Sequence, residues 1–448
     1  MFPLLSVKIE NFRGIRDLDL LLDPRATVLF GRNAVGKTTV IDALCIGLGA
    51  IGTRMPGSTG RDFDLGDLRR PRRATPSEKP GVVAQYASVT MRGAGDVEWQ
   101  LAKVRDKTIR LPKPFLGRAK LHDWLDPKIT AIQNKDHDAG VALPVVAAYG
   151  PERAVVEIPL RERDFGKDFP RLAGLNGSLK ATTRFKSVFE WFRLMEDEER
   201  RERERRKDFD YRLPALEWVR RAITAALPAC RNPRTLNKPI RLVVDFVRDD
   251  GGIEELAIKE LSDGYRTHFA LVADLARRTV QVNPTDDLAS TTHGTQSAGV
   301  VLIDEIDLHL HPSWQTTVLP SLLTTFPHIQ FIVTTHSEQV ISSVKKEQVF
   351  ALEDAGGQVQ AVGVPFAQGA SGERVLSLLM GVEDRVPGEV TTLLREYLKL
   401  VEGGRGEAPE ARALRVRLDG ELPGDPLLID ADSEIERAKI LTRLGGLT

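Results

Sequence analysis

The sequence predicts an α/β fold that carries a helical, short coiled-coil-like insertion and ends in a small helical tail. The first observation is an apolar run at residues 26–30 that leads directly into a Gly-rich loop and then into helical periodicity. The second is a pair of apolar stripes at helical spacing between residues 184 and 227, and the third is helical spacing again beyond residue 366. We therefore expect an α/β body at residues 1–170 and 229–365, the insertion at 171–228 and the tail at 366–448.

Length, charge and cysteine content bound the class of protein. At 448 residues the chain is longer than one hydrophobic core usually supports, so appendages to the main body are expected. The 63 basic and 63 acidic residues cancel, which excludes a strong overall attraction to nucleic acid or an anionic membrane and leaves a local basic patch open. Cys45 and Cys230 lack the spacing of a metal site or a disulfide framework and are typical of a reducing compartment.

The sequence carries no signal for export or membrane insertion. No apolar run approaches the roughly 18 residues that cross a bilayer. Residues 1–6 lack the basic start and the cleavage site of a signal peptide. We therefore expect a cytoplasmic protein without a membrane partner.

The elements of the body follow in chain order. Residues 4–22 alternate like two strands around Asn11 and Gly14, which supply turn chemistry, and residues 249–252 form a second hairpin signal. The Gly-, Pro- and Arg-rich stretch 57–81 predicts an irregular surface segment, and the Thr-, Ser- and Asp-rich stretch 283–299 predicts a mobile loop. Further strands are expected at residues 82–89, 97–104, 143–148, 240–247, 253–258, 300–303 and 329–334, and helices at 38–48 and 265–280.

The insertion contains a charged segment, residues 196–207, between its two apolar stripes. Acidic and basic residues stand four apart in it, and such pairs each stabilise a helix by roughly 0.2–0.5 kcal/mol. The pattern predicts a solvated helical projection, with a nucleic-acid contact as the alternative. The expected pairs are Asp197 with Arg201, Glu199 with Arg203, and Glu202 with Arg206.

Residues 31–38 match the pattern G-x-x-x-x-G-K-[ST] and have a strand before them and a helix after them. In that context, backbone amides of the loop and the helix N-terminus cradle phosphates, Lys37 neutralises the β- and γ-phosphates, and the Thr38 hydroxyl ligates Mg²⁺. The alternative is a Gly-containing turn that matches by chance. The residues expected to contact the nucleotide here are Gly31, Arg32, Asn33, Gly36, Lys37, Thr38 and Thr39.

The apolar strand at residues 300–303 delivers two carboxylates at its C-terminal end, where α/β sheets place their ligands. Asp304 suits a Mg²⁺ ligand, and Glu305 is the candidate general base for the water that attacks the γ-phosphate. Alone, an apolar strand that ends in two acids is unremarkable. Downstream of a phosphate-binding loop it predicts the second half of an ATP site.

The segment Leu261-Ser262-Asp263-Gly264-Tyr265 lies between these two motifs and resembles the signature of the ABC ATPase superfamily. The resemblance implies that Ser262 and Gly264 bind the γ-phosphate held by a second copy, in an ATP-sandwiched homodimer. It also implies that His336 is the switch histidine. Taken alone, Ser262 is an N-cap for the helix that follows and His336 a structural residue at a strand end.

Two further features refine the resemblance. Asp263 and Tyr265 depart from the Gly and Gln of the commonest signature and match the variant of RecF-like and OLD-like ATPases. Residues 9–13 resemble the opening of SMC, RecF and OLD heads, which makes Arg13 a candidate nucleotide contact, and Asp307 falls in the loop that communicates between subunits. The nucleotide-sensing position stays open among three residues, Gln85, Asp64 and Asp67.

Residues 143–153, 305–312 and 372–444 resemble the ATPase subunit of Septu-type and retron-associated anti-phage defence systems, which pairs with a separate HNH nuclease. The resemblance implies a dimeric ATPase that regulates such a nuclease effector. The alternatives are an ATP-gated scaffold or sensor with little turnover, and a RecF-like DNA repair ATPase. The cofactors implied are ATP and Mg²⁺; the partners are a second copy and an HNH-type nuclease, with nucleic acid left open.

Overall fold

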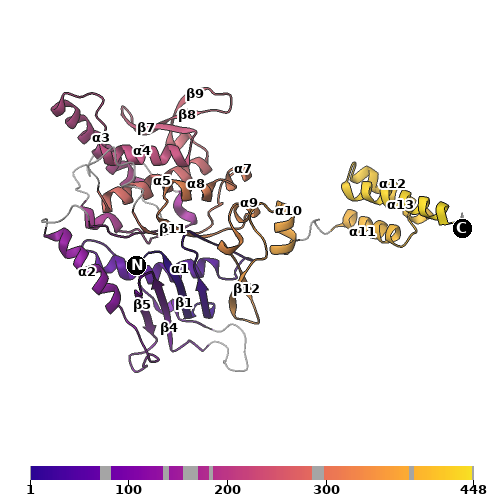
Figure 1. The fold of residues 1–448 in the computed structure, drawn as a ribbon, viewed down its shortest axis with the longest axis horizontal. Coiled ribbons are helices and arrows are strands. Elements are labelled where there is room, and N and C mark those ends of the chain that lie inside the picture. The colour runs from indigo at the N-terminus through magenta and orange to yellow at the C-terminus, as the bar shows by residue number, and fades with distance from the viewer. Residues whose placement is uncertain are drawn as a thin grey trace. The chain divides into compact units, whose positions relative to one another are not determined.

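The computed structural model describes residues 2–70, 82–134, 141–154, 170–180, 185–284, 297–382 and 388–445. The chain divides into two compact units, residues 1–375 and 376–448. The predicted α/β body lies in the first unit (Figure 1). Within the described residues, no helix is long and apolar enough to span a membrane.

A six-stranded sheet lies at the centre of the first unit. Its order is β13-β12-β3-β11-β10-β6, and every neighbouring pair is parallel except β12 with β13. Strands β3, β6, β10 and β11 are buried at every residue, which is why they appear in the sequence as largely apolar runs. The buried polar exceptions are Thr27 on β3 and Gln330 and Thr334 on β11. The strands are β3 Ala26–Phe30, β6 Val145–Tyr149, β10 Gly299–Ile303, β11 Ile329–Thr334, β12 Val349–Asp354 and β13 Val359–Gly363.

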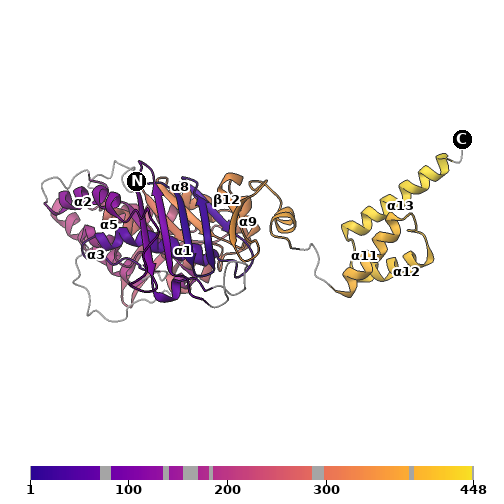
Figure 2. The ribbon, with the colours of Figure 1, turned by 90° about the horizontal axis from the view of Figure 1, so that it is seen from below.

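A second sheet is antiparallel, in the order β2-β1-β4-β5. It contains the predicted N-terminal hairpin, β1 (Leu4–Phe12) and β2 (Ile15–Leu21), with β4 (Tyr86–Gly93) and β5 (Glu98–Val104). Helix α1 (Lys37–Arg54) contacts this sheet and also β10, so it lies between the two sheets. It is longer than predicted and buried around most of its circumference. Figure 2 shows the antiparallel strands side by side next to α1.

Helices cover the face of the central sheet that lies opposite α1. Helix α5 (Asp263–Val282) packs against β6, and α3 (Phe185–Arg206) and α4 (Pro214–Ala226) pack against α5. In Figure 1 the layers follow one another from β1, β4 and β5 through α1 and β11 to α5, and then to α4 with strands β7–β9. The other α-helices in the described part of this unit are α2 Ala119–Gln133, α7 Pro312–Gln315, α8 Val318–Thr325, α9 Glu338–Ser342 and α10 Gly372–Arg374.

A three-stranded sheet of β7 (Cys230–Asn237), β8 (Ile240–Val247) and β9 (Ile253–Ala257) contacts the helices. The β8–β9 hairpin confirms the turn predicted at residues 249–252. Strand β7 was not predicted, because its Asn232-Pro233 step and its charged residues disfavour a strand assignment. Short 3-10 helices occur at Leu65–Asp67, Pro151–Ala154, Arg171–Leu175, Ile258–Glu260 and Lys346–Gln348.

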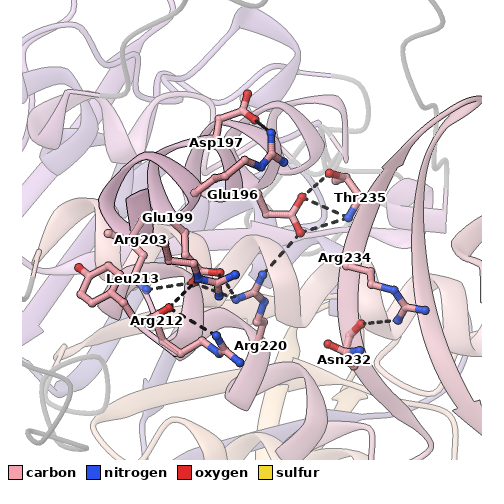
Figure 3. Close-up of polar contacts among 12 residues, drawn as sticks. Glu196, Asp197, Glu199, Arg203, Arg212, Leu213, Arg220, Asn232, Arg234 and Thr235 are labelled. Carbon is pink, nitrogen blue, oxygen red and sulfur yellow. Dashed lines mark hydrogen bonds and ion pairs between the residues drawn. The ribbon is translucent and has the colours of Figure 1, made fainter. Parts of the chain in front are cut away.

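The charged segment of α3 is only partly solvated, which corrects the predicted projection (Figure 3). Glu199 is 3% exposed and accepts hydrogen bonds from Arg203, from Arg220 on α4 and from the backbone amide of Leu213. Glu196 accepts a hydrogen bond from the backbone amide of Thr235 on β7, and burial raises the pKa of Glu196. One face of the segment is therefore fixed to the body.

Two of the three expected ion pairs on α3 are present. Glu199 with Arg203 and Glu202 with Arg206 form as predicted. Asp197 pairs with Arg200 instead of Arg201, at three residues' spacing. Residues three apart and residues four apart are both neighbours on a helix surface, so either Arg200 or Arg201 is within reach of Asp197.

The described residues of the second unit form three α-helices around a core of its own. They are α11 (Glu389–Glu402), α12 (Pro409–Glu421) and α13 (Pro426–Gly445). Helix α11 lies within the stretch beyond residue 366 for which helical spacing is predicted. The buried residues of the core are Leu394, Tyr397, Val401, Ala411, Leu418, Leu428 and Ala431. Residues 375–379, at the boundary of the two units, form a π-helical turn.

Parts of three segments singled out in the sequence lack a structural description. Residues 285–296 of the predicted mobile loop, residues 71–81 of the Gly-, Pro- and Arg-rich stretch and the tail residues 385–387 lie outside the described residues. Cys45 and Cys230 are buried free thiols, and burial raises the pKa of each to about 12. Neither thiol takes part in a disulfide, as expected.

Candidate nucleotide-binding site

The Gly-rich loop joins the end of β3 to the start of α1, as its sequence pattern predicts. Gly31 and Gly36 have φ angles of 149° and 117°, and Ala34 between them has 64°. A Cβ atom on Gly31 would lie 2.5 Å from the carbonyl oxygen of Leu352 on β12. Glycine is therefore required at position 31 by both backbone conformation and space. Arg32 and Asn33 are exposed on the loop.

Lys37 is the first residue of α1, and its side chain folds back over the loop. Its Nζ atom donates to the carbonyl oxygens of Gly31 and Arg32, at 2.8 and 3.2 Å. Burial lowers the pKa of Lys37, while the carboxylates of Asp304, Glu305 and Asp307 raise it in opposition. The ammonium is thus held beside the loop, with carboxylates near enough to interact with it.

Asp304 belongs to the carboxylate motif that follows β10, and it is bonded to the first turn of the helix after the loop. The Thr38 hydroxyl donates to its Oδ2 at 2.8 Å, although the two residues are 266 positions apart. The Thr334 hydroxyl at the end of β11 donates to its Oδ1 at 2.5 Å. Asp304 is only 3% exposed. A carboxylate and a hydroxyl next to a phosphate loop are the donor set that Mg²⁺ prefers, so the residues present fit this ion.

Glu305 lies on the same edge of the sheet. Its φ angle is 52°, a left-handed conformation that costs of order 1–3 kcal/mol for a residue other than glycine. Its backbone amide donates to the Thr334 hydroxyl at 2.8 Å, which helps to hold this conformation. Thr334 therefore contacts both carboxylate residues of the motif. The strand that contains Thr334 was predicted, but the contacts of Thr334 with both acids were not.

His336 and Asp307 meet beyond the end of β11. The Asp307 carboxylate accepts hydrogen bonds from the Thr335 hydroxyl at 2.6 Å and from the backbone amide of His336 at 3.3 Å. His336 is half-buried. The structure thus brings the loop, both acids and the histidine to the carboxyl edge of one parallel sheet.

Arg13 lines a cavity of about 680 Å³ beside the loop, together with Ala34, Val35, Gly36, Thr39, Arg69, Arg70, Asp354 and Val359. Its guanidinium donates to Asp67 at 2.8 Å and to Asp42 on α1 at 2.5 Å, and Arg61 donates to the other oxygen of Asp42. Arg13 is thus close to the loop, as expected of a nucleotide contact, and is oriented by two carboxylates. Asp42 and Arg61 were not predicted, because no local pattern marks them.

The three candidates for the nucleotide-sensing position differ in their surroundings. Asp67 binds Arg13 at the cavity, whereas the Asp64 carboxylate caps a 3-10 turn through the amides of Gly66 and Asp67. Gln85 is exposed, and its backbone carbonyl accepts from Arg105. Asp67 is thus bonded to a residue that lines the cavity.

Ser262 and Gly264 lie at the start of α5. Ser262 occupies the N-cap position, but its side chain makes no capping hydrogen bond. A Cβ atom on Gly264 would lie 2.6 Å from the carbonyl oxygen of His309, in the loop that follows Glu305. Among the described residues, no hydrogen bond or ion pair joins residues 261–265 to residues 31–39. Ser262 is therefore the N-cap residue of α5 by position, as the local explanation predicts, but its hydroxyl does not bond the helix.

Comparisons with known proteins bear on the family of the chain. A family model described as "AAA domain, putative AbiEii toxin, Type IV TA system" matches residues 26–342, and a second, "AAA ATPase domain", matches residues 3–48. The chain is 27% identical to the Retron Ec83 probable ATPase of Escherichia coli, over 96% of this chain and 86% of that protein. It is 32% identical to the Septu protein PtuA of Bacillus mycoides (strain KBAB4), over 32% of this chain and 19% of that protein.

Among solved structures, an SMC head bound to the C-terminal winged-helix domain of ScpA is similar at 14% identity. The match has a TM-score of 0.47 and covers 81% of this chain and 97% of that one. The first family model spans more than half of the chain and includes the Gly-rich loop, both acids and His336. The chain therefore belongs to the AAA-domain family that this model describes.

Proposed function

We propose that this chain binds ATP with Mg²⁺ and hydrolyses it in a homodimer, and that it thereby regulates a partner nuclease in anti-phage defence. The observation that carries the chemical part is the hydrogen bond between Thr38 and Asp304. It joins the phosphate loop to the carboxylate motif across 266 residues of sequence.

Each residue of the site has a distinct proposed role. The loop amides and Lys37 hold the phosphates, and Thr38 with Asp304 hold Mg²⁺. The ion, when bound, neutralises charge that develops on the phosphate oxygens. Glu305 orients and deprotonates the attacking water, and His336 contacts the γ-phosphate.

Completion of the site by a second copy is supported by the position of the signature. Ser262 and Gly264 make no described bond to the phosphate loop of their own chain. The Ser262 hydroxyl is also not engaged as a cap, which leaves it available to an anion at the start of α5. In the proposed dimer, these two residues bind the γ-phosphate that the other copy holds.

The regulatory part of the proposal rests on the relatives. The chain is similar over nearly its full length to a retron ATPase, and over a shorter segment to a Septu protein. We infer an HNH-type nuclease as the partner. Co-purification with the product of a neighbouring HNH reading frame tests this inference. The inference fails if no such gene is present, or if its product does not bind.

The hydrolytic part is tested with Glu305→Gln. A general base contributes about 10²–10⁴-fold, so the variant is expected to hydrolyse ATP at least a hundredfold more slowly while still binding it. Glu347→Gln is the control, because Glu347 is exposed near the amino end of β12, away from the carboxyl edge. If the wild type hydrolyses ATP no faster than Glu305→Gln, the chain is an ATP-gated scaffold instead of an enzyme.

A further inference from the structure

Tyr149, the last residue of β6, makes one bond toward the catalytic edge and one toward the signature helix. Its backbone carbonyl accepts from the backbone amide of Asp304 at 2.8 Å. Its hydroxyl donates to Oδ2 of Asp274 on α5 at 3.0 Å. Tyr149 is 2% exposed, so both bonds are shielded from water.

Asp274 belongs to a buried ionic cluster on α5. It accepts from Arg277 and Arg278, each at 2.7 Å, and all three side chains are buried. Arg278 also donates to the carbonyl oxygen of Gly174 at 2.8 Å, and Arg277 to the side-chain oxygen of Gln281 at 2.6 Å. The cluster therefore fixes α5 both to β6 and to the segment that contains Gly174.

Stability alone does not explain such a cluster. Two buried cations share one carboxylate, and Nε of Arg277 has no hydrogen-bond partner among the described residues. Buried ion pairs are often no more stabilising than apolar side chains of the same size, because desolvation offsets their attraction. Buried ion pairs instead fix the orientation of the groups that they join. Here the cluster fixes the Asp274 carboxylate, and with it the position of α5 relative to Tyr149.

Helix α5 extends this constraint to the signature. Asp274 lies eleven residues after Asp263, the first residue of α5. That separation is about three turns, or about 16 Å, of a continuous helix. Near its start, Gly264 packs against the carbonyl oxygen of His309, in the loop that follows Glu305. The helix is thus bonded to β6 through Asp274 and lies close against the loop that follows Glu305 at Gly264.

We propose that Tyr149 is a positioning residue that couples the signature of each chain to its own Asp304 and Glu305. In the dimer of the proposed function, on which this inference rests, the start of α5 contacts ATP held by the other copy. Any displacement of α5 then acts through Asp274 and Tyr149 on the backbone amide of Asp304. The two ATP sites of the dimer consequently turn over in concert.

Tyr149→Phe tests this proposal because it removes only the hydroxyl. The aromatic ring and the backbone carbonyl that accepts from Asp304 remain. We expect ATP affinity within twofold of wild type, kcat at least fivefold lower, and a Hill coefficient that falls from above 1.5 to near 1.

Thr279→Val is the matched control. Thr279 is fully buried on the same helix, and its hydroxyl accepts from Trp218 and donates to the Ala276 carbonyl, with no described bond to β6. It should lose a similar amount of stability and keep the wild-type kcat and Hill coefficient. If both variants lose kcat in proportion to lost stability, Tyr149 is only structural and the proposal is wrong.

Amide hydrogen exchange without nucleotide tests the coupling independently of hydrolysis. Tyr149→Phe should speed exchange of residues 304–308 and of residues 263–267 together, whereas Thr279→Val should leave 304–308 unchanged. Unchanged exchange at 304–308 in Tyr149→Phe refutes the coupling even if the chain is an ATPase. Conversely, equal hydrolysis by wild type and Glu305→Gln refutes the proposed enzymatic function and leaves the exchange result standing.

Discussion

Replacement of Thr334 by valine removes one hydroxyl that serves both acids of the candidate site. That hydroxyl donates to Asp304 at 2.5 Å and accepts from the backbone amide of Glu305 at 2.8 Å. Thr334 is fully buried, and valine has nearly the same shape, so packing in β11 should be retained. The change therefore isolates the two hydrogen bonds.

The expected loss of stability follows from those bonds. A hydrogen bond to a charged group contributes about 1.5–3 kcal/mol and one to a backbone amide about 1 kcal/mol. We therefore expect the free energy of unfolding to fall by about 3 kcal/mol. If about 1.4 kcal/mol of this appears as misplacement of Asp304 and Glu305 in the transition state, kcat falls about tenfold.

Urea unfolding and steady-state ATP hydrolysis are the two measurements. Thr27→Val is the control, because Thr27 is also fully buried, lies on the adjoining strand β3 and accepts only from the amide of Asp23 among the described contacts. It should lose about 1 kcal/mol and keep its kcat. If Thr334→Val is no less stable than Thr27→Val and hydrolyses ATP at the wild-type rate, Thr334 does not organise the site.

Two further predictions concern the loop and the buried cluster. Gly31→Ala should abolish ATP binding and lower the melting temperature, because the Cβ atom of the alanine would lie 2.5 Å from the Leu352 carbonyl oxygen. If an ATP titration of this variant gave the wild-type affinity, the loop geometry would be contradicted. Burial raises the pKa of Asp274, but the two neighbouring arginines outweigh it and lower that pKa to about 2. The ionised carboxylate therefore contributes to the free energy of unfolding above about pH 4, and this contribution is lost as the pH falls toward 2. The difference in unfolding free energy between wild type and Asp274→Asn should therefore shrink over that range, and a constant difference would contradict it.

Local patterns were sufficient for the main elements of the fold and most of the site. The loop around Lys37 and the strand before Asp304 carry their signal within a few residues, because a buried parallel strand is a largely apolar run. Their meeting at one sheet edge follows from parallel topology. The prediction of Asp304 next to Thr38 was therefore a consequence of fold class, and the structure places them in contact.

Features that depend on distant partners were not predictable in the same way. Glu199 appeared solvated in a run of charges, but Arg220, on another helix, makes its burial possible. Helix α2 (Ala119–Gln133) was missed, and its Pro127 interrupts the pattern of a regular helix. For Glu199 the deciding partner lies outside the sequence window on which the prediction was based, whereas for α2 the obstacle is a residue within the helix.

Ser262→Ala separates a local role of Ser262 from its proposed role in a second copy. An N-cap serine that bonds its helix is worth about 0.5–2 kcal/mol, but Ser262 makes no such bond, so the variant should unfold within about 0.5 kcal/mol of wild type. ATP binding by the monomer should also be retained, while ATP-dependent dimerisation and hydrolysis are lost. Light scattering with ATP in the Glu305→Gln background, where hydrolysis does not reverse closure, measures the dimer directly. If Ser262→Ala lost ATP binding as a monomer, Ser262 would act within its own chain and the composite site would be wrong.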